Sequence, residues 1–211
     1  MLAQFSVNPL REQIPITLPG SLRDVVTDSR GYVYVSGTTP LPDANLWRSI
    51  DGGVSFERLS LPPFAVDSLQ PDPVTAERLY ALGDGLWQSN DTGVTWQLIH
   101  AERPLQLLID PTESRRLAVI TANRIFVSRD RGENWQALPN RCAPKCGYSP
   151  ANAVDPSGSA FLVESVDGLE LWSDWGREPR PVAFRTPFPY YVRPDSFIYH
   201  PNQPGQFYAL G

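Results

Sequence analysis

The sequence of 211 residues has few of the side chains that most often build metal and catalytic centres, with only two histidines and two cysteines. No apolar run approaches the ~20 residues that a membrane-spanning helix needs, so membrane insertion is not expected. The formal net charge is −5, which disfavours nucleic acids and anionic membrane surfaces as partners. The N-terminus lacks the basic and apolar regions of a signal peptide. Either the protein stays inside the cell or its true start is missing.

The two cysteines, Cys142 and Cys146, lie in a segment bounded by prolines, residues 139–150. No histidine lies near them, so a zinc-ligand set is not expected, and a thioredoxin-like redox pair would have a different spacing. The pattern favours a small loop disulfide and hence an oxidising compartment. The alternative is a pair of free thiols in a cytosolic loop. No metal site and no cofactor are predicted.

Proline and glycine are abundant instead, with 22 and 15 residues spread along the chain. Six tryptophans and eight tyrosines argue against disorder, so the prolines and glycines indicate many turns in a folded chain. The chain is long enough for one domain with a sizeable core. Helical periodicity of useful length is missing, and short apolar segments between turns favour β-strands.

Three segments share one frame, in which Ser, Asp, Gly and an aromatic residue recur at fixed spacing: "SIDGGVSF", "SNDTGVTW" and "SRDRGENW". Their aspartates are spaced by about 40 residues, a period typical of repeat architectures. The frame residues are Ser49, Asp51, Gly53 and Phe56; Ser89, Asp91, Gly93 and Trp96; and Ser128, Asp130, Gly132 and Trp135. A fourth, altered copy, "WSDWGREP", keeps Asp174 and Gly176 but has Trp172 in place of the serine and Pro179 in place of the aromatic residue.

A second pattern, an apolar strand, a turn and another apolar strand, recurs in phase with the first. Its five copies align at Asp28, Gln70, Asp110, Asp155 and His200. Because further strands precede and follow each frame, one period holds four short strands, which we call a, b, c and d. A four-stranded unit of roughly 40 residues is typical of a β-propeller blade. The predicted fold is therefore an all-β propeller of four-stranded antiparallel blades.

The period divides the chain into a lead-in, four complete blades and the start of a fifth. The predicted bounds are 1–21 for the N-terminal strand and lead-in, 22–63, 64–103, 104–148 and 149–190 for the blades, and 191–211 for the connection and start of blade five. Since the fifth blade lacks its third strand, we expect the chain to be a fragment of a longer propeller. The alternative is that residues 13–19 supply an outer strand to that blade and close a small ring.

Each frame falls at the turn between strands c and d, where every residue has a structural task. The aspartate can accept backbone N–H bonds from the turn that follows it. The glycine supplies a positive φ, the hydroxyls tie the flanks together, and the aromatic residue can pack against the neighbouring blade. These aspartates are therefore predicted to be structural and not catalytic.

The three intact frames resemble Asp-boxes, also called BNR repeats, and the resemblance covers nearly the whole chain. The superfamily includes sialidases, sortilin-type receptors, xyloglucanase-like glycosidases and photosystem II stability/assembly factor-like proteins. The resemblance implies that the box lies at the rim, away from the ligand face. It therefore identifies the fold and says little about activity.

Function is expected on the face that carries the b–c and d–a connections. Three of these are long: residues 37–45, 139–150 and 183–196. The last is rich in aromatic and arginine side chains, which suit binding surfaces. The ligand-binding candidates are Phe184, Arg185, Tyr190, Tyr191 and Arg193. The alternative is that these aromatic residues seal the gap between adjacent blades.

The predicted function is a non-catalytic scaffold that binds a protein, peptide or glycan ligand, in an extracellular, periplasmic or cell-surface location. The alternative is a glycoside hydrolase, xyloglucanase-like or sialidase-like, with catalytic residues partly outside this chain. A sialidase would have an Arg-Ile-Pro-like segment near its start, where this chain has "QIPITLP". Glu164, Asp167 and Glu170 are candidates for a carboxylate pair, although "VDG" also suits a tight turn. Catalytic residues are not identified.

Overall fold

The computed structural model describes residues 21–38, 44–59, 66–139, 153–165, 168–176, 180–181, 196–199 and 207–210. All regular secondary structure in these ranges is β-strand, so the predicted all-β class is confirmed. Several sequence predictions lie outside the described residues, among them the Cys142–Cys146 disulfide, the outer strand at residues 13–19, and the aromatic connection before residue 196.

The strands form four antiparallel sheets of four strands and one of two strands. Sheet 1 holds β1 (Ser21–Thr27), β2 (Val33–Thr38), β3 (Ala44–Ser49) and β4 (Glu57–Arg58), and sheet 2 holds β5 (Ser68–Pro71), β6 (Leu79–Leu82), β7 (Leu86–Ser89) and β8 (Gln97–His100). Sheet 3 holds β9 (Gln106–Ile109), β10 (Leu117–Ile120), β11 (Arg124–Ser128) and β12 (Gln136–Pro139), and sheet 4 holds β13 (Ala153–Val154), β14 (Ala160–Ser165), β15 (Gly168–Ser173) and β16 (Arg180–Pro181). Sheet 5 pairs β17 (Ser196–Tyr199) with β18 (Phe207–Leu210).

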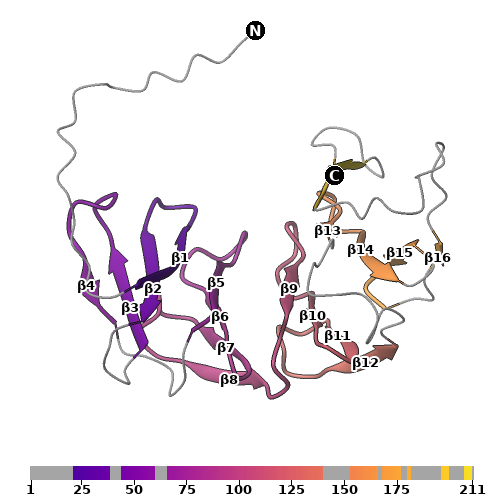
Figure 1. The fold of residues 1–211 in the computed structure, drawn as a ribbon, viewed down its shortest axis with the longest axis horizontal. Helices are drawn as coiled ribbons and strands as arrows, with labels where there is room; N and C mark the ends of the chain where they lie inside the picture. Colours follow the sequence, from indigo (N-terminus) through magenta and orange to yellow (C-terminus); the bar gives the residue numbers. More distant parts are fainter. Residues whose placement is uncertain are drawn as a thin grey trace, which may run out of the picture.

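The four complete sheets follow one another around a common centre, as blades of a propeller do (Figure 1). In each of them the first strand lies nearest the centre and the fourth lies outermost (Figure 1). Strand order follows chain order in every sheet, so each blade is a simple meander. The a–b and c–d turns meet at one end of the strands, which we call the box face. The b–c and d–a connections meet at the other end, which we call the loop face.

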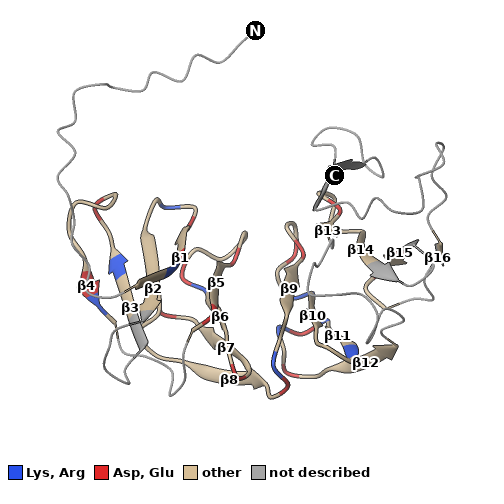
Figure 2. Cartoon of the chain, in the orientation of Figure 1, with Lys and Arg blue, Asp and Glu red and all other residues tan. Residues whose placement is uncertain are grey.

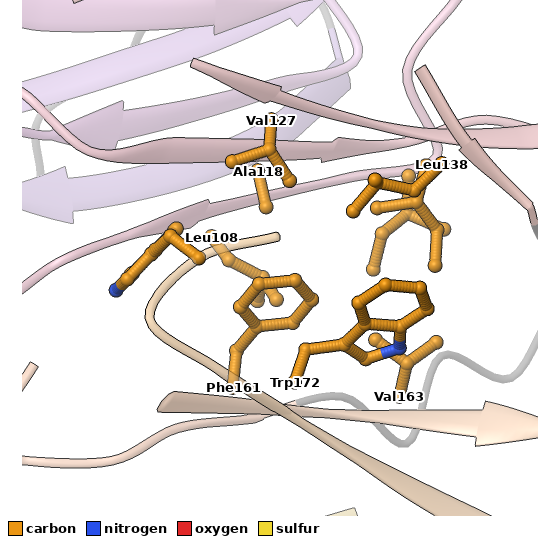
Figure 3. Packing of buried hydrophobic residues seen from close by; sticks show 10 residues of the cluster. Leu108, Ala118, Val127, Leu138, Phe161, Val163 and Trp172 are labelled. Carbon is orange, nitrogen blue, oxygen red and sulfur yellow. The ribbon is translucent and has the colours of Figure 1, made fainter. Parts of the chain in front are cut away.

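The hydrophobic core lies between adjacent sheets. Strand β10 is buried along its whole length because its side chains alternate between two interfaces. Leu117 and Val119 pack towards sheet 2, whereas Ala118 and Ile120 pack towards sheet 4. In the latter interface Phe161 and Trp172 face aliphatic residues of sheet 3 (Figure 3).

One alignment made from the sequence is wrong. Gln70 lies within β5, opposite Tyr80, whereas the aspartates of the other sheets follow the first strand. Asp72 takes their place, since its N–H bonds to the carbonyl of Arg78 as the N–H of Asp110 bonds to that of Arg116. The error arose because "QPDP" and "IDP" were matched on their first polar residue.

Candidate functional site

The three intact boxes form the same hydrogen-bonded turn. In the second box, Ser89 Oγ donates to Asp91 Oδ1 (2.8 Å) and accepts from the N–H of Gly93 (2.8 Å). The Asp91 carboxylate also accepts the N–H of Thr95 (2.8 Å) and the hydroxyl of Thr95 (2.6 Å). Equivalent bonds to Asp51 and Asp130 repeat this arrangement. Each carboxylate is therefore used inside its own turn.

The turn needs two successive residues at positive φ, of which the sequence pattern predicted only the second. Gly93 has φ 89°, as predicted for the box glycine, and the residue before it, Thr92, has φ 62°. Arg131 takes the same position in the third box, with φ 65°. The left-handed conformation points the N–H of this residue at the a–b turn of the same sheet, where Thr92 donates to the Glu77 carbonyl (2.8 Å) and Arg131 to the Arg115 carbonyl (2.9 Å).

The hydrogen bonds keep the box carboxylates ionised. Bonds from Asn134 and Ser128 lower the pKa of Asp130, with burial opposing them. Burial also raises the pKa of Asp91, but the bonds from Thr95 and Ser89 outweigh it, so the net shift is downward. A general acid needs a raised pKa. The box aspartates therefore have the opposite of the property that proton donation requires.

The fourth, altered copy does not keep the box geometry that was predicted for Asp174 and Gly176. Trp172 stands opposite Phe161, where an intact box has its serine, and it is buried. Without the hydroxyl, the bond to the a–b turn moves by one residue, and the N–H of Asp174 itself donates to the Ser159 carbonyl (2.9 Å). Trp175, at φ 49°, is fully buried and donates its indole N–H to the Gly158 carbonyl (2.8 Å). Tryptophan burial replaces the serine–aspartate network here.

The a–b turns contain buried aspartate–arginine pairs that the sequence analysis missed. The pairs Asp28–Arg30, Asp72–Arg78 and Asp110–Arg116 are joined at 2.7, 3.2 and 3.1 Å, and each aspartate is almost fully buried. Each arginine also reaches the a–b turn of the next sheet, where the acceptors are the Ala76 carbonyl, the Ser114 hydroxyl and the Gly158 carbonyl. The arginines link successive sheets on the box face. The missed signal was an arginine after each of these three aspartates.

The described part of the loop face contains an ion network that crosses three sheets. Asp67, just before β5, accepts from Arg23 on β1 (2.5 Å) and from Arg103, just before β9 (2.6 Å). Arg103 also lies 3.5 Å from Asp84, in the b–c turn of sheet 2. The side chains of Arg103 and Asp84 are 61% and 79% exposed, and Leu22, beside Arg23, and Leu105, beyond Arg103, are exposed as well.

Charges of both signs are interspersed over the described sheets (Figure 2). Within the described ranges no three or more His, Cys, Asp and Glu side chains gather as a metal site. In the same part of the chain no helix is long and apolar enough to cross a membrane.

The predicted ligand residues all lie outside the described residues: Phe184, Arg185, Tyr190, Tyr191 and Arg193. Of the acidic residues considered for catalysis, Asp167 also lies outside them. Glu170 is buried on β15 opposite Val163, and Glu164 belongs to β14, opposite Leu169. A two-residue connection joins β14 to β15, as a tight turn at "VDG" requires.

No family model matches the chain. Two curated proteins are similar to it over most of its length. One is the VPS10 domain-containing receptor SorCS1 of Mus musculus, 27% identical over 180 residues, which cover 79% of this chain and 15% of the receptor. The other is a xyloglucanase of Paenibacillus sp, 26% identical over 187 residues, which cover 67% of this chain and 18% of the enzyme. The chain thus spans less than a fifth of each relative's length.

Solved structures agree on the fold. An ancestral GH74 enzyme matches with a TM-score of 0.63 at 16% identity, over 80% of this chain and 25% of the enzyme. YCF48 from Cyanidioschyzon merolae matches with a TM-score of 0.54 at 16% identity, over 89% of this chain and 62% of that protein. At this identity the likeness concerns the fold alone. The chain has a β-propeller fold like that of the GH74 enzyme and YCF48, and its sequence is similar to the sortilin-like receptor and the xyloglucanase.

Proposed function

We propose that the chain is a non-catalytic binding module whose loop face recognises a protein, peptide or glycan ligand. The observation that carries the proposal is the ion network centred on Asp67, which gathers exposed charges from three successive sheets. Exposed ion pairs add little to folding stability, typically about 0–1 kcal/mol. Arginine is enriched at recognition surfaces, so exposed arginines such as Arg103 suit binding better than stabilisation.

The aromatic connection before β17 extends the same surface in this proposal. Residues 101–105 lead from β8 into β9, and residues 183–195 lead by the same topology from sheet 4 into β17. Tyrosine rings offer a large contact area, and guanidinium groups orient carboxylate or hydroxyl groups of a ligand. We assign ligand contact to Phe184, Arg185, Tyr190, Tyr191 and Arg193 on this basis.

The comparisons support a binding role and an exported location without deciding between ligand classes. SorCS1 is named a receptor, and the propeller fold is shared with YCF48. An extracellular, periplasmic or cell-surface location fits the receptor relative and the proposed Cys142–Cys146 bridge.

A glycoside hydrolase is the second candidate, favoured by the xyloglucanase relative and the GH74 fold match. Such an enzyme needs two carboxylates that flank the scissile bond. On the described loop face, Asp67 and Asp84 both bind the guanidinium of Arg103. Both carboxylates are thus paired with the same arginine in this arrangement, which favours the binding module over the hydrolase.

Binding to glycan and peptide arrays tests the proposal, with the chain compared to Arg103→Ala and Arg115→Ala. The two arginines are matched, since their side chains are 61% and 55% exposed, but Arg115 lies on the box face. We expect Arg103→Ala to lose at least tenfold in affinity at an unchanged Tm, and Arg115→Ala to keep both. Equal loss in both variants would point to non-specific charge effects and contradict the proposal.

A second pair of measurements tests the aromatic connection and the enzyme alternative. The double variant Tyr190→Ala, Tyr191→Ala should keep its Tm and lose binding; a Tm several degrees lower would identify the rings as core. Release of reducing ends from xyloglucan, abolished in a carboxylate variant such as Asp67→Asn, would establish the hydrolase in place of the binding module.

A further inference from the structure

His100 lies at the end of β8, where sheet 2 packs against sheet 3. Its ring centroid is 4.4 Å from that of Phe126 and 5.0 Å from that of Trp135, both of sheet 3 and both tilted by 54°. Its Nε2 atom is buried and has no hydrogen-bond partner among the described residues. A buried imidazole nitrogen without a partner beside two aromatic rings is unusual, because buried polar atoms are normally satisfied.

We infer that His100 makes the interface between sheets 2 and 3 sensitive to acid, tight while the imidazole is neutral and weakened when it is protonated. The neutral ring can carry its proton on Nδ1 and leave only an unfilled lone pair on Nε2. Protonation places a second N–H and a positive charge among the rings, with no acceptor for the Nε2–H. Such an unpaired buried donor destabilises the folded state.

The charged groups around His100 oppose this effect only weakly. Glu102 is the carboxylate whose charge acts on the imidazole, and it already accepts the hydroxyl of Thr121 (3.3 Å). Arg103 is directed to Asp67 and Asp84, and Arg124 on β11 is exposed. The aromatic faces themselves also attract a cation. Glu102 and the aromatic faces thus favour the protonated imidazole, whereas burial favours the neutral one.

Burial has the largest effect on the pKa of His100. Burial lowers the pKa of His100 from its ordinary value of 6.5, while Glu102 raises it less. Since the pKa in the folded state is lower than in the unfolded state, the unfolded state binds more protons below pH 6.5. The stability is therefore fully present above that pH and is lost as the pH falls towards the folded-state pKa.

The interface also contains a reporter of the same event. The indole N–H of Trp135 donates to the carbonyl of Ile99, the residue before His100, at 2.8 Å. A shift of the imidazole must therefore alter the environment of this proton. Its NMR signal should move with the same midpoint as the His100 ring signals.

The experiment combines an NMR titration with thermal unfolding between pH 7.5 and 5.0. The chain has two histidines, so His200→Gln, which removes the one outside the described residues, assigns the spectrum and serves as the control. We expect a His100 pKa below 6.5, and a Tm that falls by about 3–5 °C per unit of that shift. His100→Phe should lose this fall, whereas His200→Gln should keep it.

A His100 pKa at or above 6.5 would overturn the inference, as would an unchanged pH dependence of Tm in His100→Phe. If His100→Phe does not fold, the titration of the unaltered chain still decides, because a midpoint shared by His100 and the Trp135 indole is required. An indole signal that does not move across the His100 midpoint would separate the histidine from the interface and refute the coupling.

Discussion

Removal of the Asp91 carboxylate tests whether the boxes stabilise the fold. Asp91 accepts four hydrogen bonds, from Ser89 Oγ (2.8 Å), the N–H of Val94 (3.1 Å), and the N–H and hydroxyl of Thr95 (2.8 and 2.6 Å). In a buried setting each bond to a charged acceptor is worth about 1.5–3 kcal/mol. Val94 and Thr95 are exposed, so water can replace the lost acceptor in part, and we expect Asp91→Ala to cost about 2–3 kcal/mol in total.

Thermal unfolding followed by circular dichroism measures this loss. For a chain of this size a loss of 2–3 kcal/mol corresponds to a Tm about 5–10 °C lower. Asp91→Asn should have a Tm between those of the unaltered chain and Asp91→Ala, because an amide keeps one acceptor oxygen. Glu133→Ala is the matched control: this acidic residue also lies on a box turn but is exposed, so its removal should change the stability by less than about 0.5 kcal/mol.

The same variants predict a change in acid stability. Because the pKa of Asp91 in the folded chain is lower than its ordinary value of 3.8, its stabilising effect is present above that pH and is lost as the pH falls below it. Asp91→Ala should therefore differ from the unaltered chain at pH 6 and approach it at pH 2. If Asp91→Ala keeps its Tm at neutral pH but loses ligand binding, the carboxylate is functional and our interpretation of the boxes is wrong.

Three further predictions concern the turns and the cysteines. Gly158→Ala should destabilise the fold strongly and lower the Tm, because a Cβ at this position, at φ 69°, would overlap the Asp110 carboxylate. Gly31→Ala is the control: at φ 84° with open space around it, the added Cβ should cost only backbone strain, about 1–2 kcal/mol of stability. Arg131→Gly should raise the Tm by about 1–3 °C by relieving a positive φ. Mass spectrometry under non-reducing conditions should find Cys142 and Cys146 in one bridge; two free thiols in protein from its native compartment would refute the bridge and weaken the exported location.

The sequence was sufficient for the features that repeat. Four strands per period and the turn frame at Ser89–Gly93 follow from local rules, because glycine conformation and side-chain capping act within a few residues. The arginine pairs were missed because they depend on contacts between sheets. Arg30 and Arg116 lie at different distances along the chain from their aspartates, and yet each reaches the a–b turn of the sheet that follows its own. Spacing along the chain does not show such contacts.

The fourth copy shows the limit of pattern matching more clearly. Asp174 and Gly176 keep the spacing of the box but not the bonds of its serine hydroxyl, which in the intact boxes reaches both the aspartate and the glycine. Trp172 removes that hydroxyl, and Trp175 then fills the space beneath the turn, 5.2 Å from the ring of Phe161. A motif with its first residue changed is thus a different structure, even where its most conspicuous residue remains.

The aromatic residue of the box illustrates why function could not be derived from the repeat. Trp135 packs against the core between sheets 2 and 3, and its indole N–H donates to sheet 2. Trp96 packs between sheets 1 and 2, but its indole N–H donates within its own turn, to the Gly93 carbonyl. Phe56 belongs to sheet 1, which no described sheet precedes, and it is partly buried, as Trp96 and Trp135 are. The aromatic residue thus contacts the preceding sheet where one is described. The repeated positions of the intact boxes make contacts within their own turn or with the neighbouring sheet. We therefore expect a ligand to be recognised by residues that differ between blades, as the proposed loop-face site would provide.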